Sequence, residues 1–195
     1  MTKLPSPADT APDMPDTTLT GHTVSLHLVG LQDAAYLCAL RNDPRYSSHL
    51  SASVVTVAAQ RDWIAAYKTR EAQGLEYYFV IRRRDDGRAC GAVRIYGVTP
   101  PQEGGGQFTW GSWILDAAKP ARAALDSALL VYRFGFDVLG LARAVFDVRC
   151  ENAHTLRFHD RFGAPRVGQD AQDVFYEIPA ALGGDLARRA ATAFA

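Results

Sequence analysis

The sequence predicts one mixed α/β domain built around a single, mostly antiparallel sheet of six to seven strands flanked by helices. Segments with strand or helix periodicity follow one another in the order β α α β β β α β α β. A turn signal joins two neighbouring strands, and a long helical segment joins two others, which requires a right-handed parallel crossover. The length of 195 residues suits one hydrophobic core.

The composition argues against several classes of partner. The chain is 48% hydrophobic and 22% charged, and its 21 basic residues balance its 21 acidic ones. No excess of positive charge therefore predicts binding to nucleic acid or to an anionic membrane. No apolar run reaches the ~18–20 residues that span a bilayer, and the N-terminus has no apolar signal segment. We expect a soluble, cytoplasmic protein without nucleic-acid or membrane partners.

The cysteines and histidines do not predict a metal site. Cys38, Cys90 and Cys150 are far apart, and they make no CxxC pair and no metal-ligand spacing with the five histidines. We interpret them as buried or half-buried thiols in a reducing compartment.

The N-terminal half predicts a tail, a strand, two helices and a hairpin. Residues 1–19 are rich in Pro, Thr, Ser, Ala and Asp, which predicts a flexible tail ahead of a single domain at 20–195. Alternation predicts a strand at 24–29, and helical periodicity predicts helices at about 34–42 and at 56–73, the second ended by Gly74. Strands at 75–83 and 89–96 flank Asp86-Gly87, a hairpin signal. The arginines just before this turn are interpreted as a solvated hairpin tip.

The C-terminal half predicts a strand, a long helix, a strand, a short helix and a last strand. Their expected ranges are 108–115, 120–139, 142–150, 154–162 and 174–178, and an Ala/Arg-rich helix follows. Gly140 stands where a helix commonly ends.

The segment FTWGSWILDAAKPARAALDSALLVYRFGFDVLGLARAVFDVRCENAHTLRFHDRFGA, residues 108–164, carries a resemblance. Its strand, small-residue loop, long helix, second strand, Asn152 and short helix ending in Phe162-Gly163 resemble the acetyl-CoA-binding core of the GNAT superfamily of N-acyltransferases. The opening LTGHTVSLHLVGLQDAAYL looks like the branch of ribosomal-protein N-terminal and amino-sugar-nucleotide acetyltransferases. The resemblance covers roughly residues 19–178 and implies the GNAT fold, whose parallel strand pair splays apart.

The resemblance and simple electrostatics agree on a cofactor loop. A pyrophosphate binds to free backbone N–H groups at the positive end of a helix, and small side chains and basic residues favour it. The resemblance implies acetyl-CoA as cosubstrate, held here by Ala118, Lys119, Ala121, Arg122 and Ala123. The family pattern is Gln/Arg-x-x-Gly-x-Gly/Ala, and this chain has alanines at the matching positions 118, 121 and 123. An ordinary helix start with solvated basic residues is the alternative.

Further cofactor contacts are implied by the resemblance. The backbone of Trp113, Ile114 and Leu115 would pair with the pantetheine amides, and Asn152 would hold pantetheine or cap the helix that follows. On that helix, Phe158 completes the family pattern. Arg161 is expected either to contact the adenosine phosphate or to lie on a solvated helix face.

The sequence offers several candidates for the catalytic groups. Many relatives carry an acid tyrosine where this chain has His159, which could protonate the leaving thiolate or be a core or surface histidine. The family's carboxylate base would fall near Thr109, which is not a carboxylate. Glu103, His49, Asp147 or water are the remaining candidates for the base.

The function expected from the resemblance is direct acetyl transfer from acetyl-CoA to a primary amine. The preferred acceptor is the amino group of a nucleotide-linked amino sugar, because the segment at 41–46 is rich in arginine and tyrosine. A protein N-terminus is the second acceptor, and a non-catalytic acyl-CoA-binding module is the alternative of another class. The acyl chain length stays open. Two tryptophans on one strand allow a homodimer contact or burial in the core.

Overall fold

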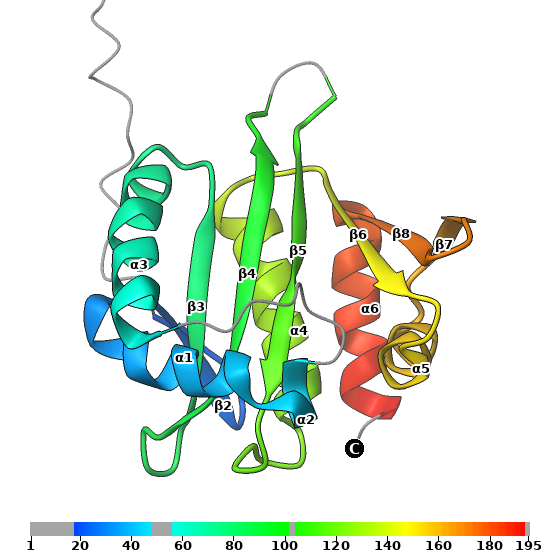
Figure 1. Ribbon diagram of the computed structural model, residues 1–195. Coiled ribbons are helices and arrows are strands. Elements are labelled where there is room, and N and C mark those ends of the chain that lie inside the picture. Colours follow the sequence, from blue (N-terminus) through cyan, green and yellow to red (C-terminus); the bar gives the residue numbers. More distant parts are fainter. Residues whose placement is uncertain (1–17, 48–55, 102–103, 194–195) are drawn as a thin grey trace, which may run out of the picture.

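The computed structural model describes residues 18–47, 56–101 and 104–193 (Figure 1). The strands are β1 (Leu19–Thr20), β2 (Val24–Leu28), β3 (Tyr77–Arg83), β4 (Ala89–Thr99), β5 (Gln107–Leu115), β6 (Arg143–Arg149), β7 (Arg166–Gln169) and β8 (Asp173–Pro179). The helices are η1 (Leu31–Asp33), α1 (Ala34–Asn42), α2 (Pro44–Ser47), α3 (Val57–Ala72), α4 (Ala123–Arg133), η2 (Phe134–Val138), α5 (Ala153–Phe162) and α6 (Ala180–Ala193).

All eight of these strands form one sheet in the order β1-β2-β3-β4-β5-β6-β8-β7. Among the strands described, β5 and β6 make the one parallel pair, and the other neighbours are antiparallel. The predicted mixed sheet with a single parallel pair is confirmed. The short strands β1 and β7 were not expected from the sequence, and they extend the sheet at its two edges.

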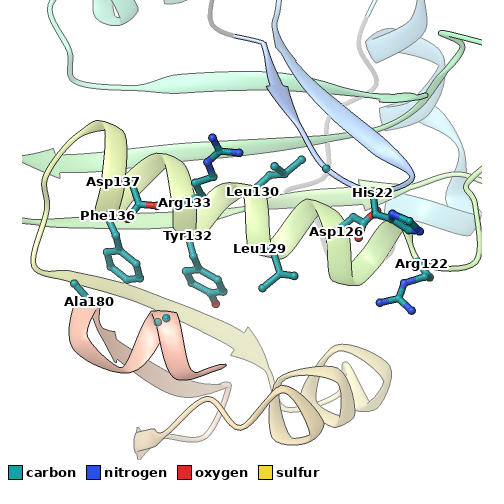
Figure 2. Close-up of a pocket in the computed structure, with 13 residues that line it drawn as sticks. His22, Arg122, Asp126, Leu129, Leu130, Tyr132, Arg133, Phe136, Asp137 and Ala180 are labelled. Carbon is teal, nitrogen blue, oxygen red and sulfur yellow. The ribbon is translucent and has the colours of Figure 1, made fainter. Parts of the chain in front are cut away.

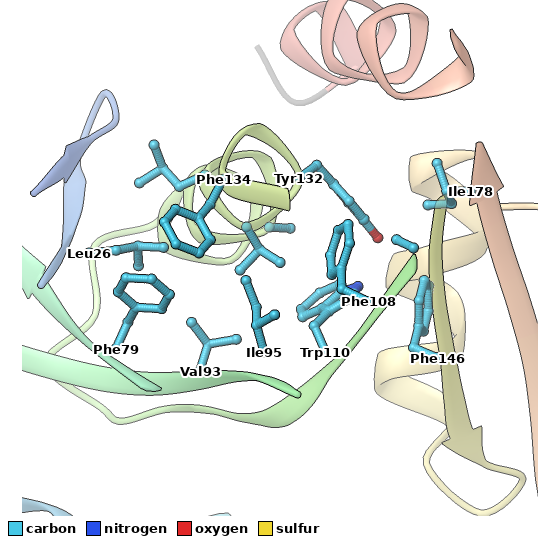
Figure 3. Packing of buried hydrophobic residues seen from close by; sticks show 14 of the residues in the cluster. Leu26, Phe79, Val93, Ile95, Phe108, Trp110, Tyr132, Phe134, Phe146 and Ile178 are labelled. Carbon is cyan, nitrogen blue, oxygen red and sulfur yellow. The ribbon is translucent and has the colours of Figure 1, made fainter. Parts of the chain in front are cut away.

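Apolar side chains pack on both faces of the sheet. On one face α4 lies across the strands, and Phe134 packs edge-on against Phe79 with ring centroids 5.1 Å apart (Figure 3). On the other face, α1 and α3 bury Leu37 and Ile64 against Tyr78. Burying such a side chain contributes roughly 1.5–3 kcal/mol. Because β3 is covered on both faces, its sequence is a continuous apolar run rather than an alternating one.

Helix α3 begins and ends where the sequence predicts. Thr56 is its N-cap, and the Thr56 hydroxyl accepts a hydrogen bond from the Ala59 N–H at 3.1 Å. Gly74 follows the helix with φ of 71°, a left-handed conformation that glycine adopts without strain. Between these ends, the helix buries Ile64 and Tyr67 completely.

The long helix begins later than predicted. Helix α4 starts at Ala123 with Arg122 as its N-cap, rather than at Pro120. The Pro120 carbonyl accepts a hydrogen bond from the Ala123 N–H at 3.0 Å, so the chain makes a turn before it becomes helical. At its other end the helix widens into the π-helical turn η2.

The folded part of the chain includes Leu19, which we expected to end the tail. Leu19 is the first residue of β1, pairs with Leu26 of β2, and is only 6% exposed. Its burial in the main core places the start of the domain at least one residue earlier than predicted. Thr18 is described and exposed, and residues 1–17 of the predicted tail lie outside the described residues.

Candidate functional site

The parallel strands β5 and β6 separate partway along the sheet. Their ladder ends at the pair Thr109↔Val145. Beyond this pair β5 continues to Leu115 and β6 to Arg149, but the described strands no longer pair with each other (Figure 1). This divergence of β5 and β6 leaves backbone groups of β5 without a strand partner on one side, as the resemblance to the superfamily implied.

A β-bulge lies in β5 beside the divergence. The register between β4 and β5 shifts between Ala92 and Arg94, which leaves an extra residue on β5. Ser112 has φ of 47° and is the one non-glycine residue with positive φ in the described part of the chain. Strained backbone of this kind persists where the surrounding structure enforces it, and it is concentrated at functional sites. Directly after it come the predicted cofactor-binding residues Trp113, Ile114 and Leu115.

Aromatic side chains close the divergence on the face covered by α4 and α5. The Trp113 ring lies 5.0 Å from the Phe158 ring, measured between centroids. The Trp113 indole N–H donates a hydrogen bond to the Ser127 hydroxyl at 3.1 Å, and Ser127 in turn donates to the Ala123 carbonyl at 2.7 Å. The structure thus brings Trp113 and Phe158, predicted from different segments, into one cluster with the start of α4.

His159 belongs to the same cluster and is only 2% exposed. Its ring centroid lies 4.6 Å from that of Phe146 and 5.6 Å from that of Trp110. Burial lowers the pKa of His159 to about 3, against a small opposing effect of the Asp160 charge. The imidazole is therefore neutral at pH 7, which argues against the predicted role of a charged general acid. The packing role that we weighed as its alternative fits this environment better.

The loop between β5 and α4 is held by two tyrosines from distant helices. The Ala117 N–H donates to the Tyr46 hydroxyl at 3.0 Å, and the Tyr36 hydroxyl donates to Asp116 at 3.0 Å. The Asp116 carboxylate also accepts from the Ala118 N–H at 2.7 Å. The Ala118 N–H, which we expected to be free for a phosphate, is therefore already bonded, and so is the N–H of its neighbour Ala117. Sequence reasoning missed these tyrosines because they lie about seventy to eighty residues upstream.

The end of the loop that can receive an anion lies further along than predicted. Ala123 is fully buried and its N–H is bonded to Pro120, so neither its side chain nor its N–H faces a ligand. The next N–H groups, of Ala124 and Leu125, lack intrahelical acceptors because they belong to the first turn of α4, where the helix dipole is positive. The exposed residues Lys119 and Ala121 and the half-buried Arg122 flank this turn.

Helix α5 presents its predicted residues at opposite ends. Asn152 is the N-cap, and its Oδ1 accepts a hydrogen bond from the Thr155 N–H at 3.1 Å, as expected for a cap. Capping leaves its Nδ2 group as a donor for another partner. Arg161 is exposed nine residues further on, about 14 Å along a helix that rises ~1.5 Å per residue. These two residues would therefore contact different parts of one ligand.

A separate groove of about 490 Å³ lies along the outer side of α4. Leu129 and Tyr132 of α4 and Phe136 of η2 line the groove together with residues of α6, and His22 and Arg122 lie at the groove's other end (Figure 2). Of the predicted cofactor-binding residues only Arg122 lines this groove. The groove is therefore largely distinct from the divergence of β5 and β6.

The structure shows where two of the candidates for a proton acceptor lie relative to the divergence of β5 and β6. Thr109 lies at the last rung of the β5–β6 ladder, and Asp147 lies just beyond that rung on β6. Glu103 and His49 lie outside the described residues.

In the arginine-rich segment at 41–46, the exposed Arg45 forms an ion pair with Asp43 at 2.6 Å. None of the groups of His, Cys, Asp and Glu in the described part of the chain is arranged to hold a metal ion.

The structure thus has the mixed sheet, the diverging parallel pair beside a bulged strand and the helix N-terminus that the resemblance to an acetyl-CoA-binding core implied. The family model of the acetyltransferase (GNAT) domain matches residues 24–165. The chain therefore belongs to the GNAT family of N-acetyltransferases, enzymes that use acetyl-CoA.

One solved structure supports this assignment, and two others share the fold. A structure described as apo FdhC, a nucleotide-linked sugar GNAT, is 36% identical, covers 92% of this chain and 99% of its own, and superposes with a TM-score of 0.82. RimJ of Mycobacterium smegmatis in complex with CoA-disulfide is 17% identical, with coverages of 92% and 95% and a TM-score of 0.76. A GCN5-related N-acetyltransferase from Brucella melitensis is 18% identical, with coverages of 94% and 88% and a TM-score of 0.70. A search of curated proteins found no match. No described helix is both long and apolar enough to cross a membrane.

Proposed function

We propose that this enzyme transfers the acetyl group of acetyl-CoA to the amino group of a nucleotide-linked amino sugar. The observation that carries the proposal is the similarity to FdhC, described as a nucleotide-linked sugar GNAT, at 36% identity over 92% of this chain and 99% of that one. Similarity of this extent includes the strands and helices around the acceptor side as well as the cofactor side. The other structures named above are under 20% identical and support the fold alone.

The residues around the divergence fit the proposed cosubstrate, which would supply an acetyl group activated as a thioester. The N–H groups in the first turn of α4, with Lys119 and Arg122 beside them, suit a pyrophosphate. The spare Nδ2 of Asn152 suits a pantetheine carbonyl. We assign backbone pairing with pantetheine to the β5 residues after the bulge, and an outer phosphate contact to Arg161.

The cysteines favour direct transfer over a covalent acyl-enzyme. Burial raises the pKa of the Cys90 thiol to about 11, so almost none of it is the nucleophilic thiolate at neutral pH. Cys38 is also buried, and the half-buried Cys150 turns its sulfur toward the Asp170 carbonyl, 4.0 Å away. In this mechanism the chain aligns the amine with the thioester carbonyl and polarises that carbonyl through backbone N–H groups near Ile114.

A panel of acceptors tests the proposal. The purified full chain is incubated with acetyl-CoA and, separately, a nucleoside-diphosphate amino sugar, the same amino sugar without its nucleotide, and a peptide with a free N-terminus. Release of CoA thiol gives kcat/KM, and mass spectrometry of the product identifies the acetylated amine. We expect the nucleotide-linked sugar to be preferred over the free sugar by at least about 100-fold in kcat/KM, equivalent to about 2.7 kcal/mol of transition-state binding.

Each other outcome would overturn the proposal. Preference for the peptide would make the enzyme a protein N-terminal acetyltransferase. Equal use of the free and the nucleotide-linked sugar would show that the enzyme does not recognise the nucleotide. Tight binding of acetyl-CoA without thiol release from any acceptor would return the chain to the class of non-catalytic binding modules.

A further inference from the structure

Asp147 lies on β6, just beyond the point where the pairing of β6 with β5 ends. On its face of the sheet, it is the first β6 residue past that point. Phe146 and Val148, its neighbours in sequence, are buried in the core on the α4 side. Because successive side chains of a strand point to opposite faces, Asp147 points to the other face, as Val145 does. Val145 is the last residue of β6 paired with β5, so the Asp147 carboxylate lies where the two strands have begun to separate.

Tyr96 comes to the same place from β4. The registers pair Tyr96 with Thr109, and Thr109 with Val145, so these three residues form one row across the sheet. The Tyr96 hydroxyl lies 3.2 Å from the point that a Cβ on Gly111 would occupy. The tyrosine therefore lies over the bare backbone of β5 next to the bulge, and the absence of a side chain at Gly111 makes this approach possible.

The negative charge of Asp147 acts on the Tyr96 hydroxyl. The pKa of Tyr96 is raised, first by burial and then by the negative charge of Asp147. Charged groups also face Asp147 from its own strand and from the β7–β8 side: Asp173, Asp170 and Arg149. Arg149 forms its ion pair with Asp173, at 3.3 Å. Within the described residues, no ion pair holds the Asp147 carboxylate itself.

The result is a carboxylate that accepts a proton more readily than an ordinary aspartate does. Its side chain is exposed at the strand surface, but loss of water around it raises the pKa of Asp147, and the charge of Asp173 raises it further. A general base works best when its pKa approaches the operating pH. The position of the group, at the start of the divergence and on the face opposite α4 and the aromatic cluster, is where an acceptor amine can approach the thioester.

We propose that Asp147 is the general base of the reaction; this inference rests on the proposed acetyl transfer. In this step the amine nitrogen forms a bond to the acetyl carbonyl carbon, and the carbon–sulfur bond of the thioester breaks. The sulfur leaves with the electron pair as a thiolate and takes a proton from water. The proton lost by the amine nitrogen passes to the Asp147 carboxylate, which later releases it to solvent.

The experiment compares Asp147→Asn with wild type in pH profiles of kcat and kcat/KM. The acceptor is whichever amine of the panel above the wild type uses, so the base is tested even where the acceptor proves to be a peptide. We expect kcat of Asp147→Asn to fall about 100-fold at pH 7, the lower range for loss of a general base. The low-pH limb of the profile should also disappear. Binding of acetyl-CoA, measured by calorimetry, should stay within about twofold because the substitution lies on the acceptor face.

Two further variants sharpen the test. Asp62→Asn removes an exposed carboxylate of α3 and serves as the matched control, with kcat expected to be unchanged. Asp173→Asn removes a charge that raises the pKa of Asp147, so the low-pH limb should move to lower pH. A low-pH limb that persists unchanged in Asp147→Asn, with kcat within about threefold of wild type, overturns the proposal. Should that variant fail to fold, a limb that does not move in Asp173→Asn overturns it equally.

Discussion

Substitution of Asn152 separates two roles that one side chain can play. Its Oδ1 caps α5 through the Thr155 N–H at 3.1 Å, and its Nδ2 is the proposed donor to pantetheine. Asn152→Ala removes both groups. Asn152→Asp keeps a capping oxygen, since Asp and Asn cap helices equally well, but replaces the donor by an acceptor.

The expected magnitudes differ between the two variants. Loss of the cap should lower the free energy of unfolding of Asn152→Ala by about 1 kcal/mol, with a range of roughly 0.5–2. Asn152→Asp should unfold at nearly the wild-type urea concentration. One net hydrogen bond contributes about 1 kcal/mol, so loss of the Nδ2 contact should raise the Kd for acetyl-CoA about fivefold in both variants. The new negative charge of Asn152→Asp should add to this loss, because the cosubstrate is anionic.

The measurements are urea denaturation followed by circular dichroism and calorimetric titration with acetyl-CoA. An Asn152→Asp variant that binds acetyl-CoA as tightly as wild type would refute the proposed contact and leave Asn152 as a cap alone. Equal stability of wild type and Asn152→Ala would refute the energetic role of the cap.

Three further predictions concern charge, pH and packing. Ala121→Glu should weaken acetyl-CoA binding about tenfold at low ionic strength and less at high salt, through repulsion of the pyrophosphate, whereas Ala121→Gln should bind nearly normally; equal effects of both would contradict this. The pKa of His159 is about 3 in the folded state, against an ordinary value of 6.5. As pH falls, the unfolded state therefore binds the proton first. The contribution of neutral His159 to stability is complete above pH 6.5 and is lost as pH falls toward 3. The free energy of unfolding should drop by up to about 1.4 kcal/mol per pH unit below ~6, and a slope that persists in His159→Phe would contradict the assignment. Gly135→Ala would place a Cβ 2.1 Å from the Phe108 ring and should destabilise the fold by about 1–3 kcal/mol, measured as a lower Tm; an unchanged Tm would show that η2 can shift.

The local elements could be predicted because their signals are local. Thr56 and Gly74 bracket α3 as their chemistry requires, and Asp86-Gly87 joins two antiparallel strands. The start of α4 was placed too early because Pro120 suits a first helical turn in isolation, while the observed turn depends on a hydrogen bond between Pro120 and Ala123.

The site was only partly predictable, because some of its contacts join segments that are far apart in the sequence. Trp113, Phe158 and Asn152 could be named from the order of elements that resembles the GNAT core, and the structure brings Trp113 and Phe158 together. The partners of the loop could not be named, because Tyr36 and Tyr46 reach it through folding of a distant segment. No sequence pattern indicates that kind of contact.

The sequence by itself determined the class of fold and the order of its longer strands and helices, because periodicity, caps and turns act over a few residues. The family followed from the resemblance of that ordered set to the GNAT core. Only the tertiary structure decided that His159 is neutral and enclosed, and that the loop N–H groups of Ala117 and Ala118 are already bonded. It also decided that Asp147 lies where β5 and β6 separate, two residues beyond the row that holds Tyr96. The physical reason is that a pKa and a free hydrogen-bond donor depend on the water and charge around a group. Those surroundings come from segments far away in the chain.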